Sequence, residues 1–364
     1  MVHDVWVEVD LGALKHNLAQ VRGLVPESTR VMAVVKGNGF GHGYTEPARA
    51  FVEAGADALA VTRIDEALPI RQAGISAPIL LFAPIQPENA EAAIEADLDV
   101  TVCSVELAQA LSVAARQMGK TAGIWVKVDT GMGRLGLLPR DVPEFFEAVQ
   151  TLPGIRVAGI FTHFATAGEP DLGPAQAQIT RFRNLLASLQ FDYGLASAAN
   201  SAAIMRLPES HLDIVRPGTL LYGQYPSSHV AHSLDLRPTW KLKARICQVR
   251  DLPKGSRIGY GGEFTTTRAT KSAIVPIGYA DGFAMAPEGP IYRQSLLRFA
   301  ARKARRSLSV EVNGRKAPVL GRVAMQLTVI DITDIDGVRA GDEVTVPAMR
   351  IPTSPLIPRV YVGL

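Results

Sequence analysis

The chain has 364 residues, enough for about two domains of roughly 150 residues each. Hydrophobic residues make up 47% of it and charged residues 20%, which is typical of a soluble globular protein. The net charge of +3 is too small to indicate a nucleic-acid partner, and no run of about 18 apolar residues could span a membrane.

The two cysteines, Cys103 and Cys247, are far apart and form neither a metal-ligand spacing nor a disulfide framework. We therefore predict no metal site and expect both thiols to be reduced, which favours a cytoplasmic location. The N-terminal sequence MVHDVWVEVD lacks the basic stretch and apolar core of a signal peptide.

After a predicted strand at residues 5–9, short and continuously apolar segments alternate with amphipathic, helix-like ones. The apolar segments are RVMAVVK, DALAVT, PILLF, DVTVC, IWVKVD, VAGIFTHF, LASAAN and HLDIVRPG. Continuous apolar strands suit a sheet that is buried on both faces. Eight strand–helix units therefore predict a (β/α)8 barrel similar to the TIM barrel, with an open doubly wound sheet as the alternative.

The alternation ends after Gly223, where QYPSSHVAHS is typical of a linker. Beyond Trp240 the apolar segments are short or alternating and are separated by glycine and proline, which indicates strands. We predict an α/β barrel domain over residues 1–228, which binds the cofactor, and a mainly β domain over residues 229–364.

Reactive residue types gather at the predicted strand ends, which is where a barrel carries its catalytic residues. In chain order they are Lys36, Asp129 followed by Arg134, His163, Asn200, Ser201, Arg216 and Gly218. Their common position indicates an active site at the carboxyl ends of the strands.

The last two strand ends favour a phosphate-bearing ligand. Asn200-Ser201 and Gly218-Thr219 offer a hydroxyl, an amide and backbone N–H groups, and barrel enzymes often hold a phosphate at these two ends. A lysine drawn back into the barrel mouth is partly desolvated, which lowers its pKa and frees the amine as a nucleophile. Lys36 facing a phosphate pocket therefore favours pyridoxal phosphate as the cofactor. A lysine that only extends from a strand end into solvent is the structural alternative.

Eight motifs of the chain resemble, in the same order, those of the alanine racemases, which are fold-type III pyridoxal phosphate enzymes. They are VVKGNGFGHG (34–43), KVDTGMGRLG (127–136), FTHF (161–164), AANS (198–201), VRPGTLLYG (215–223), IGYGGEF (258–264), GYADGF (278–283) and GRVAM (321–325). The resemblance covers nearly the whole chain.

The resemblance implies two catalytic residues and a shared active site. Lys36 would carry pyridoxal 5'-phosphate and act as acid and base on one face of the substrate. Tyr260 would be the opposing base and would reach the cofactor of the other subunit of a homodimer. Arg134 and Met325 would help to bind the substrate carboxylate, Met325 across the dimer. Lys127 matches a lysine that is often carbamylated to support that arginine.

The resemblance also implies the remaining cofactor contacts. They are His163 beside the ring, Arg216 at the pyridine nitrogen, and Asn200, Ser201, Gly218 and Thr219 around the ring and phosphate. Because arginine stays protonated, it does not give its proton to the ring nitrogen. The ring is then a weaker electron sink than it would be beside a carboxylate, which limits side reactions.

The chain departs from the family pattern at three places. Phe40 stands where a tyrosine hydroxyl commonly bonds the cofactor phosphate, and Ala324 and Gln326 replace the cysteine and aspartate that commonly flank the matched methionine. Only the short segment VPAMRIPTSPLIP precedes RVY near the C-terminus, where many members have a helix and a second phosphate-binding tyrosine. Each hydrogen bond to a charged group contributes about 1.5–3 kcal/mol, so we expect weaker cofactor retention.

The sequence therefore predicts an alanine racemase that supplies D-alanine for peptidoglycan, acts on a small amino acid, and needs neither a membrane nor a nucleic acid. The alternatives are a racemase of another or broader small amino acid such as serine, and a non-catalytic pyridoxal phosphate-binding protein. A decarboxylase of the same fold type is disfavoured. The resemblance implies an acidic residue beside the pyridine nitrogen in those enzymes, and this chain has Arg216 at that position. A nucleic-acid site would depend on the basic cluster of Arg302, Lys303, Arg305 and Arg306, which is more typical of a solvated face.

Overall fold

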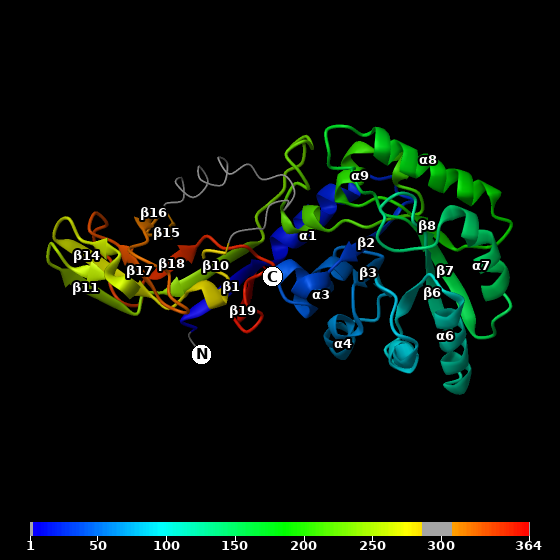
Figure 1. Ribbon diagram of the computed structural model, residues 1–364, viewed down its shortest axis with the longest axis horizontal. Helices are drawn as coiled ribbons and strands as arrows, with labels where there is room; N and C mark the ends of the chain where they lie inside the picture. The colour runs from blue at the N-terminus through cyan, green and yellow to red at the C-terminus, as the bar shows by residue number, and fades with distance from the viewer. Residues whose placement is uncertain (1–2, 286–307, 364) are drawn as a thin grey trace. The chain divides into compact units, whose positions relative to one another are not determined.

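The computed structural model describes residues 3–285 and 308–363, and its internal contacts divide the chain into two compact units (Figure 1). The first, here called the barrel unit, is Asp10–Thr239; the second, here called the β unit, is Trp240–Val362 together with the N-terminal segment that ends at Val9. The basic cluster at residues 302–306 lies outside the described residues.

Eight parallel strands form the barrel unit, and they coincide with the eight predicted apolar segments. They are β2 (Arg30–Val34), β3 (Ala58–Val61), β4 (Ile79–Leu81), β5 (Asp99–Val102), β6 (Ala122–Lys127), β7 (Ile155–Phe161), β8 (Leu195–Ser197) and β9 (Ile214–Val215). Their hydrogen-bonded order is β8-β7-β6-β5-β4-β3-β2-β9. A parallel bridge between Asn200 and Arg216 joins the two end strands just beyond β8 and β9, so the barrel is nearly closed. The predicted barrel is confirmed.

Helices follow most of these strands and lie outside the sheet (Figure 1). They are α1 (Leu11–Arg22), α2 (Lys36–Gly41), α3 (Thr45–Glu53), α4 (Ile64–Gln72), α5 (Ala90–Glu95), α6 (Val105–Gln117), α7 (Val142–Val149), α8 (Gly173–Ser188) and α9 (Ser201–Arg206). Short 3-10 turns are η1 (Pro87–Asn89), η2 (Pro139–Asp141), η3 (Pro208–Ser210) and η4 (Thr219–Tyr222). In α6 the Ser104 hydroxyl caps the first turn, and Leu107, Leu111 and Ala114 are buried on one face.

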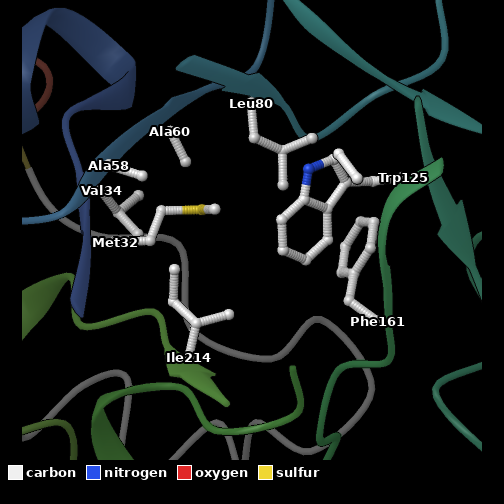
Figure 2. Close-up of a cluster of buried hydrophobic side chains, with 9 residues drawn as sticks. Met32, Val34, Ala58, Ala60, Leu80, Trp125, Phe161 and Ile214 are labelled. Atoms are coloured by element: carbon white, nitrogen blue, oxygen red, sulfur yellow. The ribbon is translucent and has the colours of Figure 1, made fainter. Parts of the chain in front are cut away.

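Side chains from several strands fill the inside of the barrel (Figure 2). Met32, Leu80, Trp125 and Ile214 point toward one another there, and the small side chains of Ala58 and Ala60 on β3 lie beside Met32. Gly159 lies opposite Trp125 on the neighbouring strand, where a Cβ atom would come within 2.4 Å of the indole. This packed interior forms the floor beneath the carboxyl ends of the strands.

The β unit is built from antiparallel strands, as the short alternating segments predict. They are β1 (Val5–Asp10), β10 (Trp240–Arg245), β11 (Gln248–Leu252), β12 (Arg257–Ile258), β13 (Phe264–Thr265), β14 (Thr270–Val275), β15 (Ser309–Val312), β16 (Arg315–Pro318), β17 (Thr328–Asp331), β18 (Glu343–Val346) and β19 (Arg359–Val362). They form sheets with the orders β16-β15-β18-β10-β1-β19, β11-β14-β17 and β12-β13. Two 3-10 turns, η5 (Tyr260–Gly262) and η6 (Tyr279–Asp281), lie between strands.

The two units differ at both ends from the predicted ranges 1–228 and 229–364. The N-terminal strand β1 pairs with β10, with Val7 opposite Leu242, and so belongs to the β unit. The linker up to Thr239 stays with the barrel unit because Arg237 exchanges two hydrogen bonds with the side chain of Asn17 in α1, at 2.8 and 2.9 Å. In the part of the chain that the structure describes, no helix combines the length and apolarity needed to cross a membrane.

Candidate active site

A cavity of about 500 Å³ opens at the carboxyl ends of the barrel strands. Its lining contains these barrel residues predicted for the site: Lys36, Lys127, Arg134, His163, Asn200, Ser201, Arg216, Gly218 and Thr219. Asp129, which was also predicted to lie at this rim, is not part of the lining. Tyr260 and Met325 do not line it and lie in the β unit. The structure therefore brings together residues from strand ends that are nearly 200 positions apart in the sequence.

Lys36 begins an unusual turn directly after β2. The four residues from Gly37 to Phe40 have φ between +52° and +63°, which makes one left-handed turn. Glycine and asparagine adopt this conformation readily, whereas a bulky residue such as Phe40 costs roughly 1–2 kcal/mol there. The Lys36 side chain faces the cavity, with its Nζ atom 5.7 Å from the centre of the Phe82 ring.

The surroundings of Lys36 lower the pKa of its amine. Desolvation by the neighbouring protein is the largest cause, and the positive charge of Arg134 acts in the same direction. The Glu66 carboxylate opposes both. A lowered pKa increases the fraction of free amine at neutral pH, which is the form that attacks a carbonyl carbon.

Lys127 at the end of β6 is buried, with 4% of its surface exposed. Its Nζ atom donates to the Val128 carbonyl at 3.0 Å and lies 4.9 Å from the centre of the Phe161 ring. Burial, assisted by the positive charges of Arg216 and Arg134, lowers the pKa of Lys127 to about 7. A substantial fraction of this amine is therefore uncharged near neutral pH.

Arg216 is buried beneath the cavity, where three oxygen atoms accept its N–H groups. They are Ser197 Oγ, the Thr162 carbonyl at 2.6 Å and the Ala198 carbonyl at 3.2 Å. Burial lowers the pKa of Arg216 to about 9, so the guanidinium stays charged at neutral pH. Burial and then the charge of Arg216 lower the pKa of His163 to about 3, so its imidazole is neutral.

Asp129 has a structural role in the loop that carries Arg134. Its carboxylate accepts the N–H groups of Gly131, Met132 and Gly133 at distances from 2.8 to 3.2 Å. Burial alone would raise the pKa of Asp129, but these donors outweigh it and the pKa is lowered. The anion thus holds the tight turn that leads to Arg134.

The ends of β8 and β9 form a polar cradle of Asn200, Ser201, Gly218 and Thr219. Asn200 Oδ1 caps α9 by accepting two backbone N–H groups at 3.1 Å, and Ser201 Oγ accepts the Gly218 N–H at 2.9 Å. Thr219 Oγ1 is buried and has no hydrogen-bond partner among the described residues. A buried hydroxyl without a partner is costly, which indicates that a ligand group bonds it.

Phe40 places an apolar ring beside this cradle. The ring stacks on Tyr222 with centroids 4.6 Å apart, and its Cζ atom would lie 3.1 Å from a Cβ atom at Gly218. His42, two residues on, is fully buried, and its ring nitrogens lie within hydrogen-bonding distance of the Gly39 carbonyl and the Thr239 hydroxyl. These contacts give His42 a structural role in holding the turn.

In the β unit, Tyr260 and Met325 lie on neighbouring turns and are exposed, by 75% and 58%. Tyr260 occupies the turn between β12 and β13, and Arg322, on the turn that carries Met325, forms an ion pair with Glu263. The Met325 carbonyl accepts the Ala280 N–H at 3.0 Å. The ion pair and this hydrogen bond hold the two turns from which both side chains project into solvent.

Two supporting residues were not singled out from the sequence. Gln178 in α8 bonds the His163 carbonyl and the Thr130 hydroxyl, and Glu66 in α4 accepts the Gly37 N–H. Gln178 gives no sequence signal, because it lies in the middle of an amphipathic helix. Glu66 was recognisable in principle, since it is an acidic residue shortly after the strand segment DALAVT.

A (β/α)8 barrel with a desolvated lysine and an unpaired buried hydroxyl in one polar cavity defines a barrel enzyme of the pyridoxal phosphate class. Residues 9–226 match the family model described as "Alanine racemase, N-terminal domain" and residues 239–354 match "Alanine racemase, C-terminal domain". The chain belongs to the alanine racemase family.

Curated relatives and solved structures agree with this assignment. The chain is 40% identical over 349 residues to the alanine racemase of Methanococcus maripaludis, covering 94% of this chain and 89% of the relative. It is 39% identical to that of Desulforamulus reducens, covering 100% of both. The solved alanine racemase of Clostridium difficile 630 is 31% identical, with a TM-score of 0.91, and the match covers 100% of this chain and 96% of that one.

The alanine racemase family depends on pyridoxal 5'-phosphate. The cavity fits that cofactor, because it combines several cationic side chains with the unpaired Thr219 hydroxyl.

Proposed function

We propose that this chain is a pyridoxal phosphate-dependent racemase that interconverts L-alanine and D-alanine, with Lys36 and Tyr260 as its two bases. The observation that carries the proposal is the position of the Lys36 amine in one cavity with the unpaired Thr219 hydroxyl. The D-alanine product would serve peptidoglycan synthesis. The two free thiols, Cys103 and Cys247, are in keeping with the cytoplasmic location that we propose.

Bound pyridoxal phosphate would supply an electron sink next to the substrate α-carbon. Lys36 would hold it and move a proton at Nζ on one face of the substrate, and Tyr260 would move a proton at Oη on the other. Two opposed bases allow inversion without the substrate turning over. Asn200, Ser201, Gly218 and Thr219 would hold the cofactor, with neutral His163 beside the ring and charged Arg216 at the ring nitrogen.

Arg134 and Met325 would bind the substrate carboxylate. We further propose that the active protein is a homodimer in which the β unit of one subunit supplies Tyr260 and Met325 to the other. Large apolar side chains exposed on the β unit support this proposal, because exposed apolar side chains that lie together mark interaction sites. They include Tyr260, Tyr279, Met285, Met325 and Leu327.

The proposed activity is tested by incubating the purified protein and cofactor with single L-amino acids and separating the products by chiral chromatography. We expect D-alanine to form fastest from L-alanine. The changes at Ala324 and Gln326 adjoin the matched Met325, so L-serine is the competitor to include. A faster rate with L-serine would favour the broader racemase, and cofactor binding without any D-product would favour the non-catalytic alternative.

Lys127 is predicted to carry a carbamate. Carbon dioxide reacts with an uncharged amine, and the pKa of about 7 makes that form abundant as the pH rises through neutrality. The resulting anion would pair with Arg134 among the cations of the cavity. Carbon-13 NMR in labelled bicarbonate should show a carbamate signal that grows as the pH is raised from 6 to 8. The signal should be absent from Lys127→Ala; a signal that persists in that variant would place the group elsewhere.

Phe40 has no hydroxyl to bond the cofactor phosphate. We predict that the Thr219 hydroxyl makes a hydrogen bond to the phosphate that compensates in part. Thr219→Val removes one hydrogen bond to a charged group, worth about 1.5–3 kcal/mol, so the cofactor dissociation constant should rise about tenfold or more. Thr219→Ser keeps the hydroxyl, so its cofactor dissociation constant should stay near the parent value. Thr180→Val, which removes an exposed hydroxyl on α8, is the matched control. Equal cofactor titrations for Thr219→Val and the parent would refute this role.

A further inference from the structure

A buried carboxylate lies behind the turn that begins at Lys36. Glu66 is in the first turn of α4, and only 3% of its side chain is exposed. Its Oε1 atom accepts the Gly37 N–H at 2.9 Å, and its Oε2 atom accepts the N–H groups of Thr62 at 2.7 Å and Arg63 at 3.3 Å. One side chain therefore joins the turn after β2 to the loop after β3.

The contact to Gly37 matters because the turn it holds is conformationally unfavourable. Four consecutive residues of that turn are left-handed, and the conformation is unfavourable above all for Phe40, because glycine and asparagine adopt it more readily. A buried carboxylate is itself stable only when donors satisfy it. Glu66 and the turn thus stabilise each other, and Lys36 immediately precedes the bonded Gly37.

The charge of Glu66 also acts on Lys36. Arg134 disfavours a proton on the Lys36 amine and Glu66 favours one. The other charged or titratable groups that face the cavity are Lys127, His163, Arg216 and Glu169, and those close to Glu66 are Tyr44, Arg63 and Asp65. The groups that face the cavity are mostly cationic, and Glu66 itself does not line it.

We propose that Glu66 is a positioning residue for Lys36, whose carboxylate fixes the left-handed turn and offsets the positive charges that face the amine. The proposal rests on the assigned role of Lys36 as the cofactor lysine. Glu66 acts through Lys36 and does not contact the reacting atoms.

The test measures the titration of Lys36 in the full-length chain after hydroxylamine has released the cofactor. Peptide mass spectrometry follows the rate of Lys36 acetylation against pH in the parent and in Glu66→Gln. We expect the midpoint to move to lower pH in the variant, because the neutral amide no longer favours the protonated amine. Asp65→Asn is the matched control: Asp65 is next in sequence, 68% exposed and engaged with Arg63 at the surface. It should leave the midpoint at the parent value.

A second measurement separates positioning from charge. Hydrogen exchange of the peptide that contains Gly37 should be faster in Glu66→Asp, because the shorter side chain cannot reach the Gly37 N–H group. It should also be faster in Glu66→Gln, because the amide has one acceptor oxygen for backbone donors that the two carboxylate oxygens bind on opposite sides. Glu66→Asp keeps the charge, so its acetylation midpoint should lie nearer the parent. If Glu66→Gln does not fold, hydrogen exchange at Gly37 in Glu66→Asp still tests the proposal. An unshifted midpoint in the folded glutamine variant, or unchanged exchange at Gly37 in the aspartate variant, would overturn the proposal.

These readouts are independent of the proposed function. They use cofactor-free protein, whereas borohydride reduction of the loaded parent shows separately whether Lys36 carries the cofactor. If borohydride does not attach the cofactor to Lys36 but the acetylation midpoint still shifts in Glu66→Gln, Lys36 is not the cofactor lysine. The effect of Glu66 on the Lys36 amine would then still stand.

Discussion

Lys36→Ala should lower kcat/KM for alanine racemisation by roughly 10²–10⁴-fold from the loss of acid–base catalysis alone, and by more if the cofactor is no longer held. The physical reason is that one amine would hold the cofactor and move the proton on one face of the substrate. The cavity supplies the desolvation that keeps this amine reactive. Racemisation is followed by chiral chromatography at saturating cofactor.

Lys15→Ala is the control for Lys36→Ala, because Lys15 lies on α1 and forms a surface ion pair with Glu53. Its rate should equal that of the parent. Borohydride treatment of the loaded parent should attach the reduced cofactor to the peptide containing Lys36, and Lys36→Ala should show no such peptide. Attachment at Lys127 instead would transfer the cofactor role to that residue.

The barrel could be predicted because its strands are buried on both faces and their sequences are therefore continuously apolar. The same reasoning could not place the strand at Val5–Asp10. Its alternating pattern identifies a strand with one buried face, but its partner β10 lies more than 200 residues away. Local periodicity carries no information about which distant strand completes a sheet.

The cavity residues could be predicted for a related reason. A parallel barrel places the carboxyl ends of all its strands at one rim. The residue types at the strand ends were therefore sufficient to predict that Lys36, His163 and Arg216 line one cavity. The left-handed turn and its contact with Glu66 could not be predicted in this way. They depend on φ angles and on a contact between two loops, neither of which has a periodic signature.

Tyr260→Phe should slow removal of the α-proton from L-alanine by roughly 10²–10⁴-fold and leave exchange of the D-alanine α-proton with solvent near the parent rate. Under the two-base proposal, Lys36 serves one face and Tyr260 the other, so loss of the hydroxyl affects one enantiomer. Mass spectrometry of deuterium incorporation in heavy water measures both rates. Tyr193→Phe, on the loop before β8 and outside the cavity lining, should change neither. Equal slowing of both enantiomers would contradict the assignment.

Mixing the two inactive variants tests whether Tyr260 crosses between subunits. If the site is shared, a heterodimer of Lys36→Ala and Tyr260→Phe contains one site with both defects and one site with neither. Activity should therefore return when the variants are denatured and refolded together, and should stay low when each is refolded alone. If Tyr260 instead serves the barrel of its own chain, every site in the heterodimer keeps one defect and no activity returns. The exposed position of Tyr260 on the β unit favours the first outcome.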